Sequence, residues 1–154
     1  MKTFFTAIAL TLLMSIAFAE QHDHKKSPVN EKTGHSKSSL VLNHGEKWPV
    51  DQVMRENMSA IHQKFKLISE LSKSNKISNK EARDLSTVIS ESAKNIVSKC
   101  KMEAKQDAAF HAILSDLFAV AAELQKGDKV ESPLEKLRLT LKSYTEYFDQ
   151  SFSN

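Results

Sequence analysis

Apolar residues recur every three or four positions along four stretches of the chain, which is the spacing of one face of an α-helix. The pattern predicts helices over about residues 51–72, 78–100, 104–126 and 132–150. The predicted inward-facing residues are Met54, Met58, Ile61, Phe65 and Ile68 in the first helix, Leu85, Val88, Ile89, Ser92, Ile96 and Cys100 in the second, Phe110, His111, Leu114, Leu117, Phe118, Ala121 and Leu124 in the third, and Leu134, Leu137, Leu141, Tyr144 and Phe148 in the fourth.

Several predicted helix ends carry residues that favour capping. Ser78 and Glu81 have the spacing of a capping box, in which each side chain accepts a hydrogen bond from a free backbone N–H. Gly127 suits the left-handed residue that ends a helix. Ser132 is predicted to cap the fourth helix, with Pro133 at its first position, where the missing N–H costs nothing.

Four helices of this length, joined by short turns, favour an all-α fold: an up-down-up-down antiparallel four-helix bundle over residues 48–154. No alternating pattern of a β-strand competes with this prediction. Because the caps and apolar faces all lie inside residues 48–154, we expect this part to fold alone as a monomer.

Residues 1–19 have the pattern of a secretory signal peptide. A basic start, Met1-Lys2, precedes about a dozen apolar residues and Ala17-Phe18-Ala19, the small-x-small sequence before a cleavage point. The apolar run is shorter than the roughly twenty residues of a membrane span. We therefore expect a periplasmic protein, cleaved after Ala19 and not inserted in the membrane.

Residues 20–47 are polar and lack a sustained helical or strand period, so we expect a disordered tail. This tail holds four of the six histidines, His22, His24, His35 and His44. Imidazole is a common ligand of copper, nickel and zinc, and a flexible chain can wrap several around one ion. The alternative is a solvated linker. Removal of the tail is expected to leave the melting temperature nearly unchanged.

Cleavage after Ala19 also predicts a candidate copper site. The new terminus, Glu20-Gln21-His22, places an imidazole at the third residue behind a free amine. That amine, two deprotonated amide nitrogens and the His22 nitrogen form a square-planar set that suits Cu(II) and Ni(II), and His24 is close enough to assist. The alternative is that the His-rich tail places a histidine near the cut by chance.

Charge and motif content exclude several classes of function. The formal net charge is +3, and residues 48–154 carry 16 Lys and Arg against 15 Asp and Glu, without the basic clusters that nucleic acid or an anionic membrane requires. The single cysteine, Cys100, excludes an internal disulfide. A Glu-x-x-His pair, a CxxCH motif and a GxSxG motif are all absent. We therefore expect a protein that is not an enzyme.

One end of the predicted bundle gathers candidate ligands. Met58, His111 and Tyr144 lie about 9–10 Å inside this end, and Cys100 lies nearer its rim. A thioether, a thiol and an imidazole at one level suit a soft ion such as Cu(I), or a haem iron. The alternative is that Met58, Cys100 and His111 are ordinary core residues.

Two resemblances bear on this site. The first, carried by Arg55-Glu56-Asn57-Met58 in the first helix and by Glu135 to Tyr144 in the last, is to the cytochrome b562 family. The resemblance implies that Met58 is an axial haem ligand. Where that family has its axial histidine, this chain has Thr145, so His111 is the candidate for the second ligand.

The second resemblance is to exported, His-tailed helical proteins labelled DnrO-like. It rests on Lys47-Trp48, Arg55 to Met58, Cys100-Lys101, Asp107 to Leu114 and Tyr144 with Phe148. Two hypotheses follow. One is a cytochrome b562-like protein that binds haem or a soft metal and exchanges electrons with a redox partner. The other is a non-catalytic protein that buffers copper or another metal through its tail.

Overall fold

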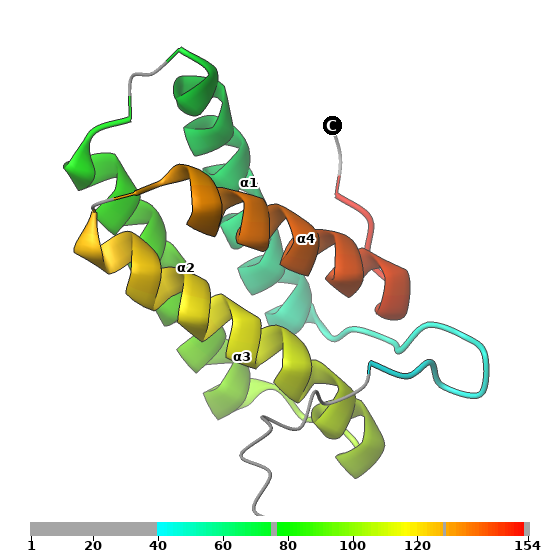
Figure 1. Cartoon of the computed structure of the whole chain (residues 1–154). Helices are drawn as coiled ribbons and strands as arrows, with labels where there is room; N and C mark the ends of the chain where they lie inside the picture. The colour runs from blue at the N-terminus through cyan, green and yellow to red at the C-terminus, as the bar shows by residue number, and fades with distance from the viewer. Residues whose placement is uncertain (1–39, 75–76, 128, 153–154) are drawn as a thin grey trace, which may run out of the picture. The chain divides into compact units, whose positions relative to one another are not determined.

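The computed structural model describes residues 40–74, 77–127 and 129–152. These residues form an all-α, antiparallel four-helix bundle, which confirms the predicted fold class (Figure 1). The helices are α1 (Gln52–Lys73), α2 (Asn79–Lys99), α3 (Ala104–Lys126) and α4 (Glu131–Tyr147). Each helix packs against the next one along the chain. Helices α1 and α4 also pack against each other, but less extensively than the consecutive pairs. No helix among the described residues is long and apolar enough to cross a membrane.

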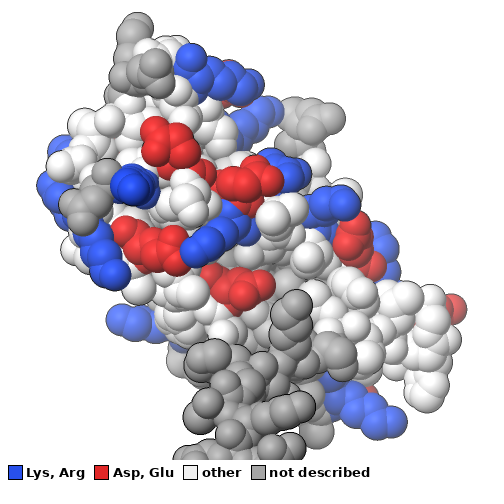
Figure 2. Space-filling model, in the orientation of Figure 1, with Lys and Arg blue, Asp and Glu red and all other residues white. Residues whose placement is uncertain are grey.

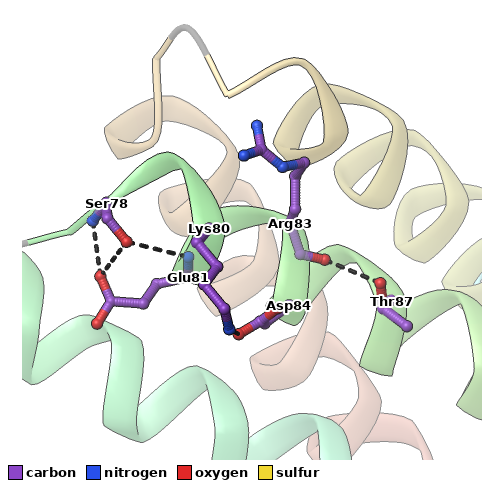
Figure 3. Close-up of polar contacts among 6 residues, drawn as sticks. All are labelled: Ser78, Lys80, Glu81, Arg83, Asp84 and Thr87. Carbon is purple, nitrogen blue, oxygen red and sulfur yellow. Dashed lines mark hydrogen bonds and ion pairs between the residues drawn. The ribbon is translucent and has the colours of Figure 1, made fainter.

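Two of the predicted caps are present. Ser78 accepts a hydrogen bond from the Glu81 N–H, and the Glu81 carboxylate accepts one from the Ser78 N–H at 2.6 Å (Figure 3). Gly127 ends α3 in the left-handed conformation, with φ of 75°. The prediction that Ser132 caps α4 is wrong, because the backbone of Val130 is already helical and Ser132 lies within the first turn. Pro133 fits there because the first four N–H groups of a helix have no partner within it.

The predicted apolar faces of α1, α2 and α4 lie largely in the core. In α3 the prediction is wrong for His111 and Phe118, which are exposed, whereas Ile113 and Val120 are buried. The difference comes from the way α3 packs against its neighbouring helices. Because α3 packs against both α2 and α4, its buried arc extends around the helix toward α4 and away from His111.

The segment before α1 is part of the packed body, which corrects the predicted boundary at residue 48. Leu40 packs against the core, and Trp48 is only 3% exposed. The Trp48 Nε1–H donates to the Val41 carbonyl at 2.7 Å. Backbone hydrogen bonds at 2.8 Å also join Trp48 to Tyr147 and to Asp149. Residues 40–47, which the sequence predicts as the end of the tail, are therefore held against the bundle through Trp48. The signal peptide and residues 20–39 lie outside the described residues.

The chain beyond α4 closes the interface that α1 and α4 leave incomplete. Gln150, which is 5% exposed, donates from Nε2 to the Arg55 carbonyl at 3.0 Å and to Ser59 Oγ at 2.9 Å. Its Oε1 accepts a hydrogen bond from the Tyr144 hydroxyl at 2.7 Å. This C-terminal segment, residues 148–152, thereby joins α1 to α4 at the same end of the bundle as Trp48 (Figure 1).

Candidate metal site at the end of the bundle

The three candidate ligands of the bundle do not converge. Met58 lies on the inner face of α1 with none of its surface exposed. Cys100 is the C-terminal cap of α2 and is partly buried. His111 points outward from α3 with 64% of its side chain exposed, and its Nδ1 lies 3.1 Å from the Asp107 carbonyl oxygen. The prediction that His111 shares a site with Met58 is therefore wrong for this arrangement of the helices.

Cys100 is held as a neutral thiol. Its Sγ donates to Asp51 Oδ2 at 3.1 Å. Burial, and then the hydrogen bond and charge of Asp51, raise the pKa of Cys100 from 9.0 to about 12. Because a thiolate is the form that binds metals, the thiol in this setting is a poor ligand at neutral pH.

Asp51 connects this thiol to the start of α1. Its Oδ1 accepts the Met54 N–H at 2.7 Å, which caps the helix. Burial by itself raises the pKa of Asp51, but the hydrogen bonds from Met54, Cys100 and Lys101 outweigh it and lower the pKa below 3.8. The carboxylate is therefore charged at neutral pH, and its two oxygens serve a helix cap and a thiol.

Aromatic side chains fill the centre of this end. Phe110, Tyr144 and Phe148 have none of their surface exposed. The rings of Tyr144 and Phe148 stack with centroids 5.2 Å apart, and Phe110 meets Phe148 edge-on at 5.5 Å. Burial raises the pKa of Tyr144 above its ordinary value of 10.0, so the hydroxyl stays protonated as the donor to Gln150.

These residues do not fit the haem that the cytochrome b562 resemblance implies. The rings of Phe110, Tyr144 and Phe148 pack on one another in the core that also encloses Met58, and none of the surface of these four residues is exposed. Thr145 stands at the expected axial position, and its hydroxyl donates to the Lys142 carbonyl at 2.9 Å. His111 faces away from the core.

The remaining described histidines are separate from one another. His62 of α1 stacks on Phe152 with ring centroids 4.2 Å apart, and burial, followed by the charge of Lys66, lowers its pKa. His44 is exposed on a tight turn, with φ of 52°, followed by Gly45 at 93°. Within residues 40–74, 77–127 and 129–152, no group of three or more His, Cys, Asp or Glu side chains is placed to hold a metal ion.

The candidate copper ligands of the mature terminus, Glu20, Gln21, His22 and His24, lie outside the described residues. No family model matches the chain, and no match was found among curated proteins or solved structures. No related protein therefore assigns a role to the candidate residues.

Sequence reasoning missed three polar residues that organise this end of the bundle. Asp51 is recognisable in the sequence as an acidic residue just before an amphipathic helix, the usual signal of a cap. Gln106, 8% exposed, donates to the Pro49 carbonyl at 2.6 Å, and Gln150 joins α1 to Tyr144. No local pattern marks either glutamine, because the Pro49 partner of Gln106 and the Arg55 and Ser59 partners of Gln150 are distant in sequence.

Proposed function

We propose that the protein is an exported, non-catalytic metal-binding protein, in which the N-terminal segment binds Cu(II) and the bundle carries it. The observation that supports this proposal best is the separation of the bundle's own candidate ligands. Met58 is enclosed, Cys100 donates to Asp51, and His111 faces outward. Four of the six histidines lie before the bundle, between His22 and His44, so this part of the sequence holds the remaining candidate metal ligands.

The strongest candidate within this segment is the mature terminus Glu20-Gln21-His22. Its ligands come from one short piece of chain, so binding requires no preformed pocket in the bundle. The bundle anchors the segment through Trp48, which is buried and hydrogen-bonded both to Val41 and to the end of α4. A metal held by the segment is thereby tethered to a stable body without disturbing its core.

Copper titration of protein purified from the periplasm tests the proposal. Amino-terminal sequencing first establishes whether cleavage follows Ala19. We then expect one tight Cu(II) site per chain, which is lost in His22→Ala and on acetylation of the terminal amine. His111→Ala is the matched control, because it removes an exposed imidazole of the bundle and leaves the terminus intact. Copper binding that survives both changes to the terminus overturns this assignment.

A b562-like electron-transfer protein is the second candidate. It is favoured by the position of Met58 on the inner face of α1, where an axial ligand must lie, and opposed by the packing of the aromatic rings. An absorption spectrum of the purified protein distinguishes the two candidates. A Soret band that is lost in Met58→Leu supports haem binding, whereas a colourless protein that takes up no added haem eliminates it.

A further inference from the structure

We draw no further inference here: the strongest candidate, the exposed face of α3 formed by Ala108, His111, Ser115, Phe118, Ala119 and Ala122, carries none, because nothing in the part of the chain that the structure describes shows what covers it.

Discussion

The Asp51–Cys100 pair gives one carboxylate two roles. Its Oδ1 caps α1 through the Met54 N–H, while its Oδ2 accepts a hydrogen bond from the thiol of Cys100 at the end of α2. The pair joins elements that are distant in sequence but meet at one end of the bundle. It also keeps the thiol protonated, which slows reactions that require a thiolate.

Replacement of Asp51 by alanine should therefore have two measurable effects. The loss of the cap should lower the unfolding free energy by about 1 kcal/mol. The pKa of Cys100, raised from 9.0 to about 12 in part by Asp51, should fall, so alkylation of the native protein at pH 8 should become faster.

Ser78→Ala is the matched control for this variant. It removes the cap of α2 at a similar expected cost, about 1 kcal/mol, but does not involve the thiol. In the wild type, the rate of alkylation should rise with pH up to about 12, as the thiolate forms. Equal alkylation rates in Asp51→Ala and the wild type would show that burial alone controls Cys100.

At the scale of elements, the non-helical segments at the two ends of the described body act together. The segment before α1 contributes Trp48, and residues 148–152 contribute Gln150. A parallel backbone bridge pairs Trp48 with Phe148, and the Lys47 ammonium donates to the Thr145 carbonyl at 2.6 Å. Residues 40–48 therefore stabilise the end of α4, although the sequence predicts most of them as tail.

Two truncations separate the ordered part of the tail from the rest. A chain that begins at residue 40 should keep the melting temperature of the mature protein to within about 2 °C. A chain that begins at residue 48 loses the acceptor of the Trp48 indole and the packing of Leu40. It should melt about 5 °C lower, from a loss of about 1 kcal/mol. Thermal denaturation followed by circular dichroism measures the melting temperature of both chains. Equal melting temperatures would show that residues 40–47 do not stabilise the bundle and belong to the tail.

At the scale of the whole molecule, Gln150 completes the bundle. Consecutive helices pack side by side, whereas α1 and α4 pack less extensively and depend on residues 148–152 to connect them. Through its side chain, Gln150 links the backbone of α1, the hydroxyl of Ser59 and the buried hydroxyl of Tyr144. The described residues contain no buried side-chain nitrogen or oxygen without a hydrogen-bond partner.

Gln150→Leu should lower the unfolding free energy by about 1–3 kcal/mol, because it leaves the Tyr144 hydroxyl buried without an acceptor. The double variant Gln150→Leu, Tyr144→Phe removes both partners and should cost less than the sum of the two single changes. Asp149→Asn is the control, since Asp149 is an exposed neighbour. Chemical denaturation of the four variants measures the coupling, and strictly additive losses would contradict the contact.

Acidic and basic residues are interspersed along the described helices. On the face drawn in Figure 2, basic side chains alternate with acidic ones. Most of the ion pairs are exposed pairs within one helix, such as Lys80–Asp84 at 2.8 Å (Figure 3). Such pairs contribute at most about 1 kcal/mol each, so the apolar core and the buried polar contacts carry most of the stability.

The sequence by itself determined the fold class, the four helices and most of their limits. These features depend on local spacing: the apolar period, the Ser78–Glu81 box and the Gly127 cap each act within a few residues. The tertiary structure decided which way His111 points, because the contacts of α3 with both α2 and α4 set its rotation. It also decided the roles of Trp48, Cys100 and Gln150, which bond to Tyr147, Asp51 and Arg55 on other elements. Local spacing places a residue on a helix, but only the packing of the helices determines what its side chain meets.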